Sequence, residues 1–158
     1  MAERVPMTPE GQQKLRDELH RLKEVEMPQV VRDISTARDH GDLSENAEYH
    51  AAKERQGMIH ARTLYIEDVL SRAEVIDPSK LGGNTVKFGA HVTVLNLDTE
   101  EQVVYQIVGP EESDLNLGRI SVSSPLARGL IGKQVGDEAT IRLPAGNRTY
   151  EIQGISFR

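Results

Sequence analysis

The chain contains no cysteine, no tryptophan and only two phenylalanines among its 158 residues. The missing cysteines exclude disulfide bonds, zinc–thiolate sites and a cysteine nucleophile. The small number of aromatic residues argues against a ligand pocket lined by aromatic side chains. No apolar run approaches the roughly 18 residues of a membrane span, and the N-terminus lacks the apolar segment of a secretory signal. We therefore expect a cytoplasmic protein with no membrane partner.

Basic residues are also fewer than acidic residues. The sequence has 19 Lys and Arg against 25 Asp and Glu, which gives a net charge of −6. A free nucleic-acid-binding module usually has a basic stripe and a high pI, so the composition argues against one. A protein partner with basic surfaces fits this charge balance better.

The two halves of the chain differ in composition. The first is rich in Ala, Glu, Arg, Leu and Lys, whereas the second is rich in Val, Ile and Gly. The change falls at Pro78, Gly82 and Gly83, which are typical of a linker. We predict an α+β protein with a helical hairpin over residues 1–76, a linker over 77–83 and a small antiparallel sheet domain with one short helix over 84–158.

The first half predicts two long helices that pack as an antiparallel coiled coil. Thr8 is a suitable N-cap with Pro9 at the first helical position, and Pro28 should bend or break the first helix locally. The second helix is expected from about Glu45 to Ala73. At 1.5 Å per residue, arms of about 30 residues project the tip roughly 45 Å from the base. The expected apolar stripes are Leu15, Leu19, Leu22, Val30, Ile34 and Ala37 on the first helix, and Ala47, Ala51, Met58, Ala61 and Tyr65 on the second.

Alternating patterns in the second half predict strands over residues 90–97, 103–108, 119–122, 138–143 and 150–155. Ser124 and Pro125 are the expected N-cap and first residue of a short helix that runs to Ile131. These elements form the sheet domain.

The tip between the two helices concentrates acidic residues. Asp39, Asp42, Glu45 and Glu48 lie within a few residues of one glycine, Gly41. Asp42 and Glu45 have the spacing of a capping box, with Ser44 as a rival N-cap. Capping does not require Asp39 or Glu48, and a tip has no core, so packing does not explain this cluster.

The alternative is metal coordination. Mg²⁺ prefers oxygen ligands and is often held by one or two protein carboxylates together with phosphates and waters. Two carboxylates at a tip make an incomplete site, so they would add to a two-metal phosphoryl-transfer centre in a partner. Arg38, Lys53 and Arg55 lie within a few turns of the tip; they either pair with neighbouring acids or guide an RNA backbone towards it.

Three stretches together resemble the GreA/GreB family of bacterial transcript cleavage factors: 40–52 at the tip, 92–98 in the first predicted strand and 124–133 around the short helix. The resemblance covers essentially the whole chain. At the position of Ser44, members of this family also have Lys, so the chain departs from the family pattern there. The thin basic face favours the GreA branch over a GreB-type factor, and Asp42 and Glu45 argue against an inhibitory paralogue.

The resemblance implies a transcription elongation factor that is not itself an enzyme. The hairpin would enter the secondary channel of RNA polymerase, and Asp42 and Glu45 would help to hold a Mg²⁺ shared with the polymerase active site and orient the attacking water. Backtracked RNA would then be cleaved near its 3′ end. Isolated, the protein should hold no Mg²⁺ stably. Arg38 and Lys53 match the family's RNA-binding basic patch.

The resemblance also implies that the second domain is FKBP-like. Its loop and short helix would dock on the polymerase, with Ser123, Ser124, Pro125 and Arg128 at the matching positions. Two other function classes are considered. A prolyl isomerase would need a pocket lined by aromatic side chains, and the second half of the chain has few of them. A passive coiled-coil adaptor would not depend on Asp42 or Glu45.

Overall fold

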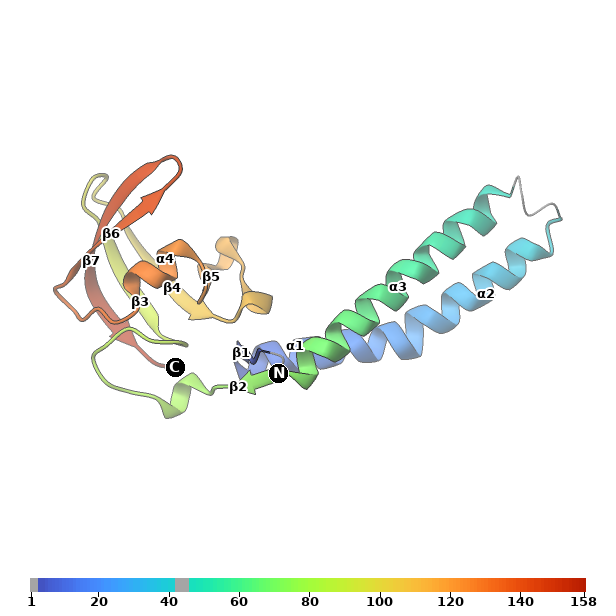
Figure 1. The fold of residues 1–158 in the computed structure, drawn as a ribbon, viewed down its shortest axis with the longest axis horizontal. Coiled ribbons are helices and arrows are strands. Elements are labelled where there is room, and N and C mark those ends of the chain that lie inside the picture. The colour runs from blue at the N-terminus through green and yellow to red at the C-terminus, as the bar shows by residue number, and fades with distance from the viewer. Residues whose placement is uncertain (1–2, 42–45) are drawn as a thin grey trace. The chain divides into compact units, whose positions relative to one another are not determined.

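The computed structural model describes residues 3–41 and 46–158. The chain divides into two units. One comprises Gln13–Arg72, and the other joins the chain up to Gln12 with Ala73–Arg158. Figure 1 shows the helical hairpin of the first unit and the strands of the second.

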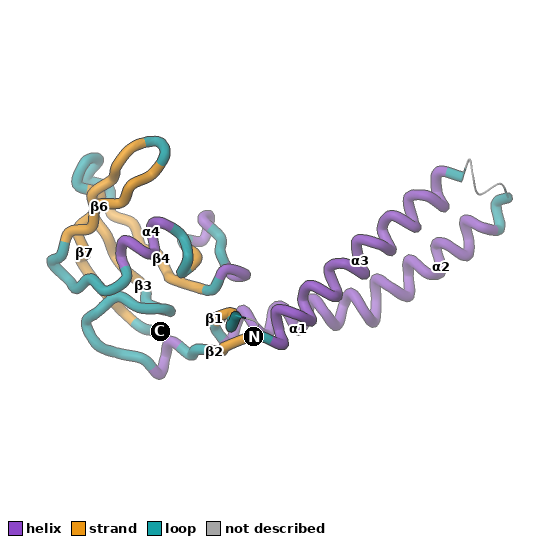
Figure 2. The backbone as a smooth tube through the Cα atoms, viewed as in Figure 1, coloured by secondary structure: helices purple, strands orange, loops and turns teal. Residues whose placement is uncertain are grey.

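The hairpin unit confirms the predicted helical hairpin. Its first arm consists of the α-helix α1 (Pro9–Arg21), the π-helix η1 (Leu22–Glu26) and the α-helix α2 (Met27–Arg38). Its second arm is the single α-helix α3 (Ala47–Ser71). Figure 2 shows α2 and α3 running side by side to the tip.

The π-helix explains an irregularity in the apolar stripe of the first arm. Leu15, Leu22, Val30 and Ala37 are all buried, but the step from Leu22 to Val30 is one residue longer than the other two steps. The N–H of Met27 bonds to the carbonyl of Leu22, which is the wider π-type turn. This turn absorbs the extra residue just before Pro28, so the stripe returns to the same face. The break predicted near Pro28 is therefore a π-turn.

The predicted stripe of the second arm is wrong. Met58 is 66% exposed and Tyr65 is 45% exposed. The buried residues of α3 are Ala52, Ile59, Ile66 and Val69. Ala52, Ile59 and Ile66 repeat every seven residues, which keeps one face of a helix towards a partner helix. The predicted stripe residues, such as Ala51, Met58 and Tyr65, are instead exposed.

Ion pairs connect the two arms beside this seam. Arg62 donates two hydrogen bonds to the carboxylate of Glu18, at 2.7 and 2.9 Å. The Arg62 hydrogen bond, followed by its charge, holds the pKa of Glu18 below its usual value against the opposing effect of burial. Lys23 lies 3.8 Å from Glu67. These contacts supplement the apolar seam, which specifies the faces of the two arms that meet.

The second unit contains a five-stranded sheet of order β5-β4-β3-β7-β6. The strands are β3 (His91–Asn96), β4 (Gln102–Val108), β5 (Arg119–Ser121), β6 (Glu138–Leu143) and β7 (Gly146–Ser156). The helix α4 (Pro125–Leu130) packs on β6, and Ala127 and Leu130 enter a core with Val92, Val94 and Ile152. Because Gly129 has no side chain, the helix approaches Ile141 closely.

The α+β class is confirmed, and the sheet is mixed. Every pairing is antiparallel except that of β5, which runs parallel to β4. A parallel neighbour requires a crossover rather than a hairpin. The connection from β4 to β5 contains the short 3₁₀ helices η3 (Pro110–Glu112) and η4 (Leu115–Leu117), which the strand pattern did not predict.

A second, two-stranded sheet joins distant parts of the sequence. The strand β1 (Val5–Met7) pairs in parallel with β2 (Ala73–Val75), and the 3₁₀ helix η2 (Pro78–Lys80) follows within the predicted linker. The chain up to Gln12 therefore groups with the second unit, whereas composition alone assigned it to the hairpin. Composition cannot detect a pairing between residues so far apart.

One carboxylate secures the start of the first helix to this unit. Glu112 accepts hydrogen bonds from the backbone N–H of Thr8 at 2.9 Å and of Gly109 at 3.1 Å. The Thr8 hydroxyl also donates to Glu112 and accepts from the N–H of Gly11 at 3.1 Å, which confirms Thr8 as the N-cap. A Cβ on Gly11 would collide with the Glu112 side chain. We call this set of contacts the Glu112 clasp.

Candidate functional site

The first arm ends in a tightening turn at the tip. The N–H groups of Asp39, His40 and Gly41 bond to carbonyls three or four residues earlier, at 3.1 to 3.3 Å. Gly41 has a φ of 108°, which side chains disfavour and which commonly ends a helix. Gly41 therefore serves as a helix stop. Asp42 and Glu45, the predicted metal ligands, lie outside the described residues.

The second arm begins with Asn46 as its N-cap. The Asn46 Oδ1 accepts a hydrogen bond from the N–H of Tyr49 at 3.0 Å. Neither Asp42 nor Ser44 is the N-cap of α3, and the helix starts at Ala47 rather than at about Glu45. Asparagine is as good a cap as aspartate or serine, and Glu48 lies in the first turn of α3. The predicted N-caps, Asp42 and the rival Ser44, are therefore corrected to Asn46.

The same Asn46 side chain reaches the first arm. Its Nδ2 donates to the carbonyl of Ala37 at 2.6 Å. A second link lies nearby, where the Nδ1 of His40 is 3.2 Å from a carboxylate oxygen of Glu48. Glu48, which the predicted capping box did not require, thus contacts the opposite side of the turn.

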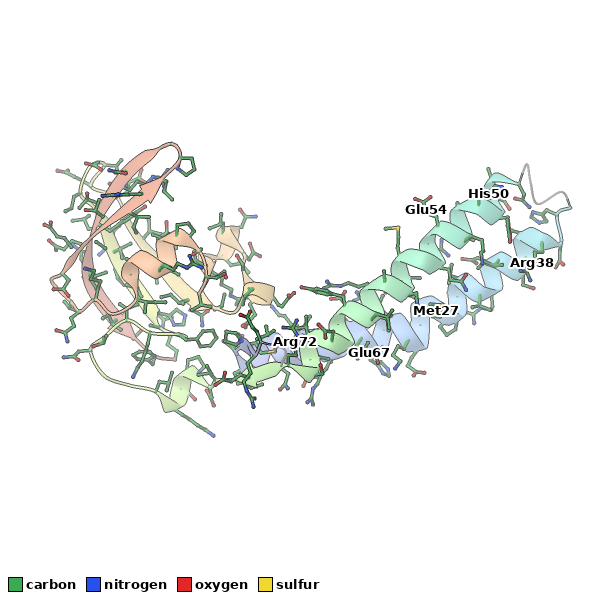
Figure 3. The ribbon with its side chains drawn as sticks, in the orientation of Figure 1. Met27, Arg38, His50, Glu54, Glu67 and Arg72 are labelled. Atoms are coloured by element: carbon green, nitrogen blue, oxygen red, sulfur yellow. The ribbon has the colours of Figure 1, made fainter. Side chains whose placement is uncertain are left out.

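The predicted basic patch comes from both arms. Arg38 lies in the last turn of α2, near the tip, as Figure 3 shows. Lys53 lies on α3 and donates to Gln56 at 3.3 Å. Both side chains are exposed, and within the described part of the chain no ion pair involves either. The third basic residue, Arg55, is instead paired with Asp33.

The Arg55–Asp33 pair links the two arms. Hydrogen bonds from Gln29 and then from Arg55 hold the pKa of Asp33 below its usual value. Arg55 is therefore engaged in an ion pair within the hairpin. Arg38 and Lys53 are the better candidates for binding a phosphate backbone.

The structure brings the four predicted docking residues together at one loop and helix start. Ser124 is the N-cap of α4, and its hydroxyl accepts from the N–H of Ala127 at 3.1 Å. The Ser123 N–H donates to the Ser121 hydroxyl at 3.2 Å. Ser123, Pro125 and Arg128 are exposed while Ala127 and Leu130 on the same helix are buried. Three of the four side chains are thus exposed and Ser124 is partly exposed, on a helix whose opposite face is buried.

Comparison with known proteins gives the class of this protein. Two family models match the chain: "Transcription elongation factor, N-terminal" over residues 5–75 and "Transcription elongation factor, GreA/GreB, C-term" over residues 81–157. The described hairpin and sheet therefore correspond to the two parts of a transcription elongation factor.

Curated relatives give the particular family. The chain is 59% identical to the transcription elongation factor GreA of Rhodospirillum rubrum over 98% of this chain and 99% of that protein. It is 58% identical to GreA of Maricaulis maris, over 98% of each chain. The crystal structure of the GreA factor homolog Gfh1 of Thermus thermophilus is also similar, at 26% identity and a TM-score of 0.45 over 97% of this chain and 99% of that one. The chain belongs to the GreA/GreB family, and its resemblance to GreA is confirmed.

Two further features of the described residues bear on the site. No helix among them is both long enough and apolar enough to cross a membrane. Within residues 3–41 and 46–158, no group of three His, Asp or Glu side chains is arranged to hold a metal ion.

Proposed function

We propose that this protein binds bacterial RNA polymerase, inserts its helical hairpin into the secondary channel and stimulates cleavage of backtracked RNA near the 3′ end. It acts as an accessory factor in the cytoplasm, and the nuclease centre belongs to the polymerase. Elongation resumes from the newly formed RNA end. The coarser role, transcription elongation, is that of the family to which the chain belongs.

The observation that carries this proposal is the division of roles at the tip. Asn46 caps α3 and Gly41 ends the first arm, so the N-cap role predicted for Asp42 is already filled. The acidic residues Asp42 and Glu45 therefore call for an explanation other than capping α3. Delivery of carboxylates to a partner's active site provides one.

The donor chemistry of the tip fits Mg²⁺. Asp42 and Glu45 supply oxygen ligands, which are the type that this ion prefers, and the described residues offer no competing cluster. When bound, the ion would neutralise developing phosphate charge. Asp42 and Glu45 would hold it jointly with the polymerase and orient the attacking water through their carboxylate oxygens.

The other predicted residues have supporting roles. Arg38 and Lys53 would bind the phosphate backbone of the nascent RNA, because each presents an exposed cation from one arm. Ser123, Ser124, Pro125 and Arg128 would contact the polymerase at the rim of the channel. The fixed helix start at Ser124 supports this role, since a pre-organised surface loses little entropy on binding.

A cleavage assay on a stalled complex tests the proposal. RNA polymerase is halted in a backtracked state, the protein is added with Mg²⁺, and short 3′ RNA fragments are measured. We expect fragments with the wild type and a severe loss of cleavage with Asp42→Asn or Glu45→Gln, while binding to polymerase persists. Glu54→Gln is the matched control, because Glu54 is an exposed carboxylate on α3 (Figure 3) and should leave cleavage unchanged.

The same assay separates the alternatives. Equal cleavage by the wild type and the Asp42→Asn, Glu45→Gln double variant would contradict the mechanism and favour a passive adaptor. Inhibition instead of cleavage would point to an inhibitory paralogue.

A further inference from the structure

One side chain links both arms of the hairpin at the tip. Asn46 uses Oδ1 to accept from the Tyr49 N–H at 3.0 Å and Nδ2 to donate to the Ala37 carbonyl at 2.6 Å. Its own carbonyl accepts from the N–H of His50 at 3.1 Å. The first bond belongs to α3, and the second reaches the last turn of α2. We call this pair of side-chain bonds the Asn46 bridge.

The chemistry of the two partners requires an amide. Tyr49 presents an N–H and needs an acceptor, whereas Ala37 presents a carbonyl and needs a donor. An asparagine side chain provides both groups on one short stem. Aspartate would keep the cap but place a carboxylate against the Ala37 carbonyl, and serine would keep the cap but has too short a side chain to replace the second bond. Capping alone therefore does not explain why this position is asparagine.

The bridge closes the segment that carries the proposed metal ligands. Residues 38–45, including Asp42 and Glu45, connect Ala37 to Asn46. The other described link across this turn, between His40 and Glu48, joins side chains that are 56% and 72% exposed, and such exposed pairs contribute little. Asn46 is partly buried, so its bonds compete less with water.

We propose that Asn46 is a positioning residue for RNA cleavage: by bridging α3 to the Ala37 carbonyl it sets the separation of the helix ends that present Asp42 and Glu45. This inference rests on the function proposed above and assigns no contact between Asn46 and RNA or metal. Catalytic groups must be held close to their productive geometry, and a displacement of about 1 Å can lower a rate by on the order of 100-fold.

Two substitutions separate bridging from capping. Asn46→Ser and Asn46→Asp both retain an oxygen that accepts from Tyr49, and both lose the donor to Ala37. Ala47→Asp is the matched control for charge, because it adds a carboxylate at the exposed first position of α3 and leaves both bonds of Asn46 in place.

The experiment measures cleavage of backtracked RNA against protein concentration, with thermal unfolding of each variant as a check on folding. We expect the half-saturating concentration to stay near that of the wild type, and the midpoint of unfolding to fall by no more than about 4 °C, the shift that corresponds to the loss of one hydrogen bond. The maximal cleavage rate should fall by on the order of 10-fold for Asn46→Ser. It should fall further for Asn46→Asp, whose carboxylate repels the Ala37 carbonyl. Ala47→Asp should cleave like the wild type.

A wild-type maximal rate in both Asn46 variants would overturn the inference while leaving the proposed function intact. A raised half-saturating concentration with an unchanged maximal rate would also overturn it, because Asn46 would then serve binding. Failure of the wild type itself to stimulate cleavage would overturn both proposals and so is distinguishable from failure of the inference alone.

A spectroscopic measurement tests the bridge without polymerase. In NMR spectra of the full chain, the side-chain NH₂ of Asn46 should exchange with water more slowly than that of Gln13, which is exposed and whose amide bonds only to a neighbouring side chain. The Ala47→Asp control should retain this slow exchange. Exchange as fast as that of Gln13 would overturn the bridge.

Discussion

The two units of this protein are stabilised in different ways. The sheet unit encloses a core in which Val92, Ile107 and Ile152 have no exposed surface. The hairpin unit has only a seam of residues such as Ile59, supplemented by ion pairs such as Arg62–Glu18. A seam specifies which helix faces meet but stops short of the tip, where polar side chains must define the geometry. From this contrast we expect the proposed catalytic end to depend on Asn46, whereas the proposed docking surface rests on the packed helix α4.

The largest expected effect compares the core with the seam. Leu130→Ala should destabilise the sheet unit by about 3 kcal/mol, because a fully buried leucine leaves a cavity that its neighbours cannot fill. Ile59→Ala should cost less, about 2 kcal/mol, since two helices can close over the lost volume. Urea unfolding of each variant provides the measurement.

Leu115→Ala is the control for this comparison, because Leu115 is 75% exposed and should change stability by no more than about 0.5 kcal/mol. Equal losses for Leu130→Ala and Ile59→Ala would mean that the seam is packed as tightly as the core, and the contrast drawn above would fail.

An intermediate effect is expected at the Glu112 clasp. Glu112→Ala should lower the free energy of unfolding by about 1–3 kcal/mol, because it removes the single carboxylate oxygen that accepts the backbone N–H bonds of both Thr8 and Gly109. Glu101→Ala, at an exposed position, is the control. The comparison is made by thermal or urea unfolding, and equal stability of the two variants would show that the clasp contributes nothing.

The smallest expected effect is a difference in acid sensitivity. Burial, followed by the charges of Arg158 and Arg119, holds the pKa of His91 in β3 below its usual value. Its Nδ1 is buried and has no hydrogen-bond partner in the described structure. The unfolded chain therefore binds a proton more readily, and the sheet unit should lose stability as the pH falls from about 6.5 through the lower pKa of the folded state.

The hairpin unit should respond only at lower pH. The lowered pKa of Glu18 contributes stability above about pH 4.3, and this is lost as the pH falls further, through the folded pKa. NMR signals from each unit, followed during urea unfolding at several pH values, separate the two responses. In His91→Gln the early loss in the sheet unit should disappear. If the loss persists in that variant, another group is responsible.

Much of the fold could be predicted from local patterns. Thr8–Pro9 and Ser124–Pro125 are helix starts whose cap and first residue act within a few positions, and alternation identified the five strands of the larger sheet. The failures have physical causes. The π-turn before Pro28 depends on keeping the apolar stripe of the first arm against the second arm, and the buried face of α3 depends on the first arm. The parallel pairing of β5 and the β1–β2 sheet join segments whose sequences carry no local signal for each other.

The same division applies to the functional residues. The sequence by itself determined the acidic tip, the GreA/GreB resemblance and the exposed candidates Arg38, Lys53 and Arg128, because residue type and spacing along the chain define them. Only the tertiary structure decided that Asn46 caps α3 and reaches Ala37, that Arg55 is committed to Asp33 and that Glu112 holds the start of α1. Each of these depends on a hydrogen bond or ion pair between residues brought together by folding, and such contacts are set by the packing of whole elements rather than by neighbours in the sequence.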